Sequence, residues 1–324
     1  MKMKAKFVSV LAVSALTATA MVAAPSAANA GGSKLLGIVS ISANEANNAR
    51  VIQGATAAAK AAGWTVQVID AAGSAPQAIA AIKNLVNKKA GMIFDLVFPT
   101  TSIGAALASA KAAGIPVATW GGGLGNPGNG VVMTTGDGGP LAIPATKLLL
   151  SNMGDAGAVL ALTYRTGQVC RDREVQFDDL LTGKSGITVT KNEVNIPGYI
   201  QDGAKYATAW LAGHPASSGS LAIWGCWDDP TVGALSALKQ LGRTDVKTYG
   251  MNGNAAALAA VQEGSMTATV FQDSVKEGAT MVSTTLKAIA AGKKWKAIDV
   301  IVPGLLLTKD TVGAFIAANP SALK

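Results

Sequence analysis

The sequence predicts an α/β protein of two lobes, each built around a parallel β-sheet with helices on both of its faces. The chain of 324 residues is long enough for two cores, and its composition (49% hydrophobic, 14% charged) is that of a folded protein. Apolar runs of strand length alternate with helical patterns, which is typical of parallel sheets covered on both sides. The alternation occurs twice, and this repetition favours two sheets over one.

The first half of the chain carries the clearer start signals. Ser74 and Gln77 have the spacing of a capping box, and Pro76 suits the first turn of the helix that they open. The predicted strands are 35–39, 65–69, 92–98 and 116–120, and the predicted helices are 47–62, a helix from 74 onward, and 102–113.

The second half repeats this scheme. Asp229 is expected to cap a helix that Pro230 begins, which places Trp227 at the mouth of the preceding strand. The predicted strands are 158–162, 187–194, 221–226, 247–251 and 267–271, and the predicted helices are 171–181, 201–211, 230–241 and 254–263.

The N-terminus has the pattern of a secretory signal peptide over residues 1–30. Three lysines precede an uncharged stretch that runs from residue 7 to about residue 24, and Ala28-Asn29-Ala30 forms a small-residue cleavage site. A membrane anchor is the alternative, but the stretch is rich in Ala, Ser and Thr rather than Leu and Ile. The first cysteine is Cys170, so no lipid anchor is expected near the cleavage point, and a periplasmic location is expected.

Composition and charge exclude several classes of function. His214 is the single histidine, which with two cysteines excludes zinc clusters and the usual histidine-based triads. No metal or cofactor is expected, since the glycine-rich stretch 121–125 also lacks the Lys-Ser/Thr of a phosphate loop. The net charge of +8 comes from scattered lysines, and the densest cluster, residues 293–296, is too short for a nucleic-acid footprint. It is interpreted as a solvated loop or as a docking patch for a membrane partner.

Ligands of such sheets bind beyond the carboxyl ends of the strands, so the loops at those ends are the candidate site. These loops carry amides, hydroxyls, arginines and tryptophans, which suit a neutral polyhydroxylated molecule. The candidates for ligand contact are Asn47, Asn48, Thr100 and Trp120 in the first half, and Arg173, Trp227, Asn252 and Gln272 in the second.

Several short motifs, in order and at similar spacing, resemble one family. They are residues 112–117 (AAGIPV), 171–177 (RDREVQF), 233–238 (GALSAL), 248–253 (TYGMNG) and 268–272 (ATVFQ). With them the chain resembles the type I periplasmic solute-binding proteins of the ribose/galactose-binding kind, which feed ABC importers, from about residue 35 to 307. The resemblance implies two Rossmann-like lobes joined by a multi-strand hinge. The expected N-terminal lobe is 31–136 plus 273–300, and the expected C-terminal lobe is 137–272 plus 301–324.

The resemblance also implies roles for individual residues. It implies that Arg173 is the ligand-binding arginine, Tyr199 the aromatic platform of the second lobe, and Gln272 the hinge-side glutamine. Asn252 stands where the family has a strand-end carboxylate. The chain departs from the family at three further places: Asn47 and Asn48 replace stacking aromatics, Gly121-Gly122 after Trp120 replace an Asp-Arg pair, and Trp227 replaces an asparagine.

Cys170 and Cys226 form an even pair in a chain expected to be exported, so a disulfide between them is chemically allowed. Both follow what should be neighbouring strands of one lobe. A Cys170–Cys226 disulfide is therefore expected.

The function indicated is that of a non-enzymatic periplasmic receptor for a sugar or sugar-like polyol. Hinge closure on the ligand would be followed by docking to the membrane subunits of an ABC importer. A monomer without nucleic-acid partners is expected, and a chemoreceptor is a compatible further partner. The alternatives are an exported glycoside-processing enzyme, whose nearby acids would be Glu45, Asp228, Asp229 and Asp273, or a binding protein for another small polar or aromatic solute or signal molecule.

Overall fold

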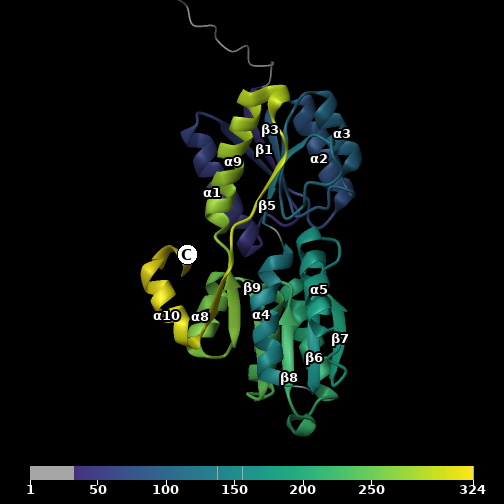
Figure 1. Ribbon diagram of the computed structural model, residues 1–324, viewed down its shortest axis with the longest axis vertical. Helices are drawn as coiled ribbons and strands as arrows, with labels where there is room; N and C mark the ends of the chain where they lie inside the picture. The colour runs from purple at the N-terminus through teal and green to yellow at the C-terminus, as the bar shows by residue number, and fades with distance from the viewer. Residues whose placement is uncertain (1–32, 137, 155, 324) are drawn as a thin grey trace, which may run out of the picture. The chain divides into compact units, whose positions relative to one another are not determined.

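The computed structural model, which describes residues 33–136, 138–154 and 156–323, contains two six-stranded β-sheets covered by helices (Figure 1). The strands of the first sheet are β1 (Ser33–Ser40), β2 (Thr65–Asp70), β3 (Ala90–Leu96), β4 (Val117–Trp120), β5 (Val131–Thr135) and β11 (Ile298–Val300). Those of the second sheet are β6 (Gly157–Thr163), β7 (Ile187–Glu193), β8 (Leu221–Gly225), β9 (Val246–Asn252), β10 (Ala268–Phe271) and β12 (Leu305–Thr308). The predicted signal peptide, residues 1–30, lies outside the described residues.

Each sheet has the topology of a doubly wound α/β lobe. The strand order is β11-β5-β4-β3-β1-β2 in the first sheet and β12-β10-β9-β8-β6-β7 in the second. All neighbouring strands run parallel except β12, which pairs antiparallel with β10. The predicted fold class of two parallel sheets flanked by helices is confirmed, and each sheet with its helices is called a lobe below.

Helices cover both sheets, because crossovers between parallel strands place them on the faces. The first lobe holds α1 (Ala46–Ala61), α2 (Ala75–Asn87), α3 (Gly104–Ala112), α9 (Ser274–Ala291) and the 3₁₀ turn η2 (Gly292–Lys294). The second holds α4 (Gly138–Met153), α5 (Gln168–Leu181), α6 (Tyr199–Ala212), η1 (Ala216–Ser218), α7 (Asp228–Gln240), α8 (Ala255–Glu263), α10 (Lys309–Ala318) and η3 (Pro320–Leu323). Within the described residues, no helix is both long and apolar enough to cross a bilayer.

The chain passes between the two sheets through short connections. It leaves the first sheet between β5 and α4, returns between β10 and α9, and leaves again between β11 and β12. We propose that the lobe boundaries after residues 136, 272 and 300 fall in these connections, which would then form the hinge.

Glycines let one pair of helices in each lobe approach closely. A Cβ atom on Gly54 of α1 would lie 1.9 Å from the carbonyl oxygen of Val275 in α9. In the second lobe, a Cβ atom on Gly203 of α6 would lie 2.1 Å from the carbonyl oxygen of Pro230 in α7. Only a residue without a Cβ atom fits at these contacts, so the helices pack backbone against backbone.

The predicted helix start signal is confirmed at α2 but is wrong at α7. The expected cap of α2 is present, since Ser74 Oγ accepts a hydrogen bond from the backbone N–H of Gln77. The expected cap of α7 is wrong: the helix begins at Asp228, and Trp227 is its N-cap residue. Asp229 instead accepts a hydrogen bond from the side chain of Asn254, because a tertiary contact takes the carboxylate away from the helix end.

Candidate functional site

A pocket lies between the two lobes, at the carboxyl ends of their strands. The first lobe contributes Ile41, Glu45, Asn48, Val97 and Trp120, and the second contributes Tyr164, Val169, Cys170, Arg173, Ile196, Trp227 and Asn252. The cavity volume of the pocket is about 30 Å³, so the lobes leave little free space between them.

The lobes contact each other beside this pocket. Arg50 of α1 donates hydrogen bonds to the backbone carbonyls of Gly253 (3.4 Å) and Gln272 (3.2 Å) in the second lobe. The Arg50 guanidinium also lies 4.9 Å from the ring centroid of Phe271. At another point of the contact, the backbone N–H of Gln168 donates to the carbonyl of Val97, at 3.1 Å. A solute in the pocket is therefore enclosed by both lobes.

Two pocket residues at strand ends have positive φ angles, which are unfavourable for residues other than glycine. Val97 follows β3 with φ of 81°, and Asn252 ends β9 with φ of 103°. Each such residue costs about 1–3 kcal/mol and is tolerated only where the surroundings hold it in place. Val97 is held by Trp120 and Gln168 through backbone hydrogen bonds, and the carbonyl of Asn252 accepts one from the backbone N–H of Gln272. Strain of this kind is concentrated at functional sites.

Arg173 is buried in the wall of the pocket with only 1% of its surface exposed. It donates to the backbone carbonyl of Cys226 (2.5 Å), to Asn252 Oδ1 (2.9 Å) and to Gln272 Oε1 (3.4 Å). Its neighbours come from the ends of β8, β9 and β10, so one guanidinium connects three strand ends. Gln272 in turn donates from Nε2 to both carboxylate oxygens of Glu277.

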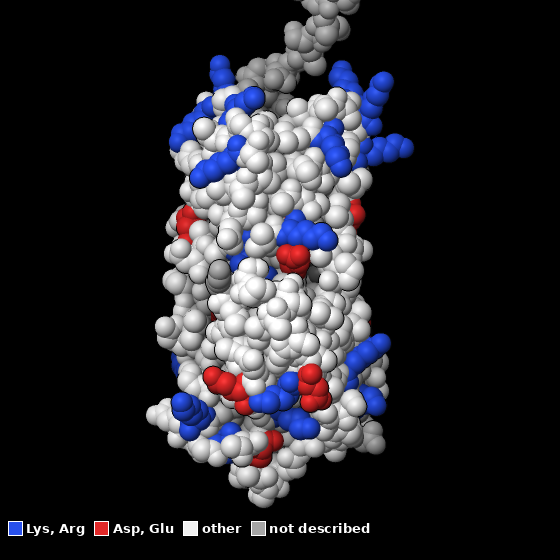
Figure 2. All heavy atoms as spheres, turned by 90° about the vertical axis from the view of Figure 1, so that its left-hand side faces the viewer, with Lys and Arg blue, Asp and Glu red and all other residues white. Residues whose placement is uncertain are grey.

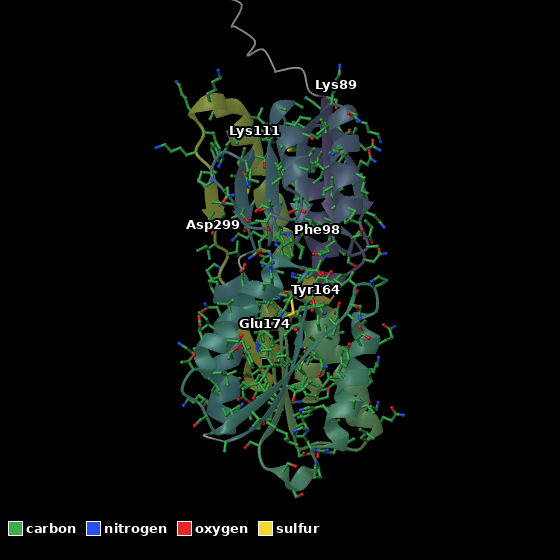
Figure 3. The ribbon with its side chains drawn as sticks, turned by 90° about the vertical axis from the view of Figure 1, so that its right-hand side faces the viewer. Lys89, Phe98, Lys111, Tyr164, Glu174 and Asp299 are labelled. Atoms are coloured by element: carbon green, nitrogen blue, oxygen red, sulfur yellow. A yellow bond between two sulfur atoms is a disulfide. The ribbon has the colours of Figure 1, made fainter. Side chains whose placement is uncertain are left out.

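The expected disulfide between Cys170 and Cys226 is present in the structure, near Tyr164 (Figure 3). Cys170 lies in the first turn of α5 and Cys226 directly follows β8. The bond therefore joins the helix that carries Arg173 to the strand end whose carbonyl Arg173 contacts.

Aromatic rings form part of the pocket wall. The ring of Trp227 lies edge-on to that of Tyr164, with centroids 6.0 Å apart, and 5.5 Å from that of Tyr199. Trp120 faces from the first lobe, and its Nε1–H donates to Glu277 Oε2 at 2.6 Å. Aromatic faces suit the C–H surfaces of a sugar or polyol.

The start of α1 presents polar atoms without protein partners. Glu45 caps the helix, and its carboxylate accepts from the backbone N–H groups of Asn47 (3.0 Å) and Asn48 (2.8 Å). Asn48 Nδ2 donates to the carbonyl of Ser42, and Asn47 Oδ1 accepts from Ser274 Oγ. This leaves Asn48 Oδ1 and Asn47 Nδ2 buried without a hydrogen-bond partner. Buried polar atoms normally have hydrogen-bond partners, so Asn48 Oδ1 in the pocket wall is a candidate contact for a polar solute.

Carboxyl groups around the pocket are buried, which disfavours their charged forms. Burial, with the nearby carboxylate of Asp229 as the second cause, raises the pKa of Glu45 to about 8. Burial likewise raises the pKa of Asp229 above its usual range. The pKa of Asp228 rises to about 7 and that of Glu277 to about 7, again chiefly through burial. Glu45 and Asp229 come from opposite lobes, so closing the pocket brings two acids together.

We expect the ligand-free protein to lose stability between pH 5.5 and pH 8.5, by about 1–3 kcal/mol. The pKa of Glu45 is higher in the folded chain (about 8) than its ordinary value of 4.5. Its contribution is therefore fully present below the ordinary value and is lost as the pH rises through about 8. Urea unfolding over this pH range measures the slope, which Glu45→Gln should reduce.

The matched control is Glu263→Gln, at the exposed end of α8. It should leave the pH slope unchanged. Because Glu45→Gln also weakens the cap of α1, only the slope and not the absolute stability is compared. An unchanged slope in Glu45→Gln contradicts the assignment.

The structure brings most of the predicted site residues together. Asn48, Trp120, Arg173, Trp227 and Asn252 line the pocket. Asn47, Tyr199 and Gln272 stand directly behind these, through the contacts given above.

Thr100 lies elsewhere, in a separate surface pocket of the first lobe with Lys111 and Asn129. The glycine-rich loop after β4 packs against it, and a Cβ atom on Gly125 would lie 2.3 Å from Thr100 Oγ1.

Sequence reasoning missed two polar groups of the pocket wall. Glu45 was a candidate only for catalysis, although its place three residues before Asn48 is the spacing of a helix cap. Tyr164 follows the end of β6 directly, where the rule for strand ends would have found it. The aliphatic members Ile41, Val97, Val169 and Ile196 carry no sequence signal that separates them from core residues.

Two parallel-sheet lobes with a polar and aromatic pocket between their strand ends define a two-lobed solute-binding protein. The chain belongs to the periplasmic binding protein family, because the model of the periplasmic binding protein domain matches residues 36–294. The resemblance noted from the sequence motifs is thereby confirmed.

The matches to solved structures with the same fold extend over nearly the whole of each solved chain. An ABC transporter solute-binding protein from Agrobacterium vitis, with bound allitol, is 26% identical with a TM-score of 0.79, covering 88% of this chain and 99% of that one. An ABC sugar transporter subunit from Rhodobacter sphaeroides is 24% identical, with a TM-score of 0.77 and coverages of 85% and 98%. A solute-binding protein from Bacillus halodurans, with bound myo-inositol, is 20% identical, with a TM-score of 0.77 and coverages of 88% and 98%.

Proposed function

We propose that the protein is the periplasmic substrate-binding component of an ABC importer and that it holds a sugar or sugar-like polyol in the pocket between its lobes. The observation that carries this proposal is the pair of buried polar atoms without partners at the start of α1, Asn48 Oδ1 in the pocket wall and Asn47 Nδ2 behind it. Hydroxyl groups donate and accept, so a polyol can satisfy both kinds of atom. The Agrobacterium vitis relative, whose ligand is the polyol allitol, supports this chemistry.

The proposed ligand contacts are made by Asn47, Asn48, Trp120, Arg173, Tyr199, Trp227, Asn252 and Gln272. The aromatic rings would cover the C–H faces of the ligand, while amides and Arg173 would bind its hydroxyls. Contacts from both lobes form together only when the lobes close, and they supply the differential affinity that closure requires.

We further propose that the protein binds its solute without altering it. The single histidine, His214, stacks on Trp210, with ring centroids 4.2 Å apart, and does not line the pocket. Asp228 accepts hydrogen bonds from the Asn254 backbone N–H and from Thr269 Oγ1, which supports a structural role. Export by the predicted signal peptide would place the protein in the periplasm, where importer subunits and a chemoreceptor are the proposed partners.

A thermal-shift screen against linear polyols, inositols, pentoses and hexoses tests this function. A ligand that binds only the native protein raises the melting temperature with concentration. Small-angle scattering with the best ligand should then show a smaller radius of gyration at saturation. No response to any member of the panel, or turnover of the bound compound seen by mass spectrometry, would reject the proposal.

A further inference from the structure

Ten of the eleven lysines described in the first lobe are gathered at the end of the sheet that lies opposite the pocket, and the eleventh, Lys276, lies at the start of α9. The ten lie near or after the C-terminal ends of helices or at the start of a strand, and in parallel α/β units both positions are at the same end of the sheet. The ten residues, called the lysine pole below, are Lys34, Lys60, Lys83, Lys88, Lys89, Lys111, Lys287, Lys293, Lys294 and Lys296. All ten are exposed, and Figure 2 shows the concentration of blue side chains at this end of the lobe.

The acidic residues described in this lobe lie on the other side. Glu45, Asp70 and Asp95 stand at or just before the carboxyl ends of strands, and Glu277 is in the first turn of α9. Figure 3 shows Lys89 and Lys111 at the far end and Asp299 nearer the middle. Within the described residues, no lysine of the pole forms an ion pair. The lobe is therefore electrostatically polarised along its strands.

The second lobe lacks this polarity and provides an internal comparison. At its corresponding edge, Arg243 pairs with Asp245 at 2.7 Å, between α7 and β9. On its surface Lys191 pairs with Glu174 at 2.8 Å and with Asp178 at 2.6 Å. The favourable interaction of lysines with helix C-termini acts in both lobes and so does not explain a pole in one of them.

Two tryptophans border the lysine pole. Trp64 follows α1 and packs against the start of β3, where a Cβ atom on Gly91 would lie 2.6 Å from its ring. Trp295 follows η2, and its Nε1–H donates to the carbonyl of Val132 at 2.9 Å. Both rings are half-buried, and tryptophan is enriched where proteins meet the headgroup level of a membrane.

We propose that the lysine pole adsorbs to a membrane surface that carries anionic phospholipids. Unpaired lysines spread over several helix ends attract a diffuse negative surface without needing a shaped partner. Protein interfaces instead favour arginine and deplete lysine, and the pole contains no arginine. Its charges do not follow one helix or groove, as a nucleic-acid footprint would require. Adsorption by this edge leaves the pocket and the second lobe facing away from the bilayer, free to open and close.

The test compares two double variants of the exported protein that remove the same charge. Lys293→Gln/Lys294→Gln changes the pole, and Lys239→Gln/Lys247→Gln changes exposed lysines of the second lobe. Binding is measured by co-sedimentation with vesicles of phosphatidylcholine that contain phosphatidylglycerol, and with vesicles of phosphatidylcholine alone. One lysine near an anionic surface strengthens adsorption about fivefold. The pole variant should therefore bind about 5- to 25-fold more weakly, and the control variant within about twofold of the parent.

The parent should bind only the anionic vesicles, and its binding should weaken between about 0.01 M and 0.15 M salt as charges are screened. Equal loss in both double variants would mean that net charge alone acts, and equal binding to both vesicle types would exclude charge recognition; either result overturns the proposal. So does binding to an acidic polypeptide or to DNA with none to vesicles. The thermal shift caused by the ligand should be unchanged in the pole variant. A loss of vesicle binding can therefore be distinguished from a failure of the proposed solute-binding function.

Discussion

Arg173→Ala is expected to weaken ligand binding at least about 30-fold and to lower the free energy of unfolding by about 2–4 kcal/mol. The guanidinium is buried and serves three acceptors at the ends of β8, β9 and β10. Its removal leaves the Cys226 carbonyl, Asn252 Oδ1 and Gln272 Oε1 without their donor, and it opens the wall that faces the ligand. Isothermal titration with the ligand found by thermal shift, together with urea unfolding, measures both effects.

Arg165→Ala is the matched control in the same lobe. Arg165 is 60% exposed at its side chain, and its partner Glu174, which is 7% exposed and outside the pocket, keeps Lys191 as a second cation. The loss of Arg165 should therefore cost at most about 1 kcal/mol and leave affinity unchanged. Arg173→Lys keeps the charge but not the fork of donors, and should recover stability better than affinity. If Arg173→Ala folds and binds as tightly as the parent, Arg173 supports the fold only and is not part of the binding wall.

Removal of the Cys170–Cys226 disulfide by the double change to alanine is expected to lower the free energy of unfolding by about 2–4 kcal/mol. The bond closes a loop with a sequence separation of 56 residues, and its loss restores chain entropy to the unfolded state. Ligand affinity should fall as well, because the bond holds α5, and with it Arg173, against the end of β8. Urea unfolding and titration of the double variant measure both.

A reducing agent provides the control for this pair. It should lower the urea midpoint of the parent and leave that of the double variant where it was. Thiol titration shows whether both cysteines of the parent are reduced. If they are and the urea midpoint of the parent has not changed, the disulfide does not make the expected contribution to the free energy of unfolding.

The fold was predictable because its strands are short apolar runs and its helices carry local start signals. Ser74 is an example, since its cap depends only on residues within one turn. Helix α4 was not predicted because it opens on Gly138-Gly139 and contains Pro144, which sequence rules read as breaks. Packing against β8, β9 and β10 forms this helix in spite of its weak local preference.

The site was predictable where it depends on position in a parallel sheet. Trp227 follows the end of β8 and Asn252 ends β9, and the sequence rule for strand ends places both at the pocket without knowledge of packing. The neighbours of Asp229 were not predictable, because Asn254, the N-cap residue of α8, is brought close to Asp229 only by the fold. Which residues of a strand-end loop point inward also depends on the loop fold, as the glycine loop over Thr100 illustrates.

The backbone contacts at Gly54 and Gly203 have a mechanical consequence. At these contacts the main chains of α1 and α9, and of α6 and α7, have no side chains between them that could compress or slide. Each lobe should therefore move as a rigid body. Two spectroscopic labels on the same lobe should therefore keep a constant separation. The separation of two labels on opposite lobes should change whenever the protein closes or opens. We expect any bending to occur in the short connections between the sheets, where a few backbone torsion angles would change.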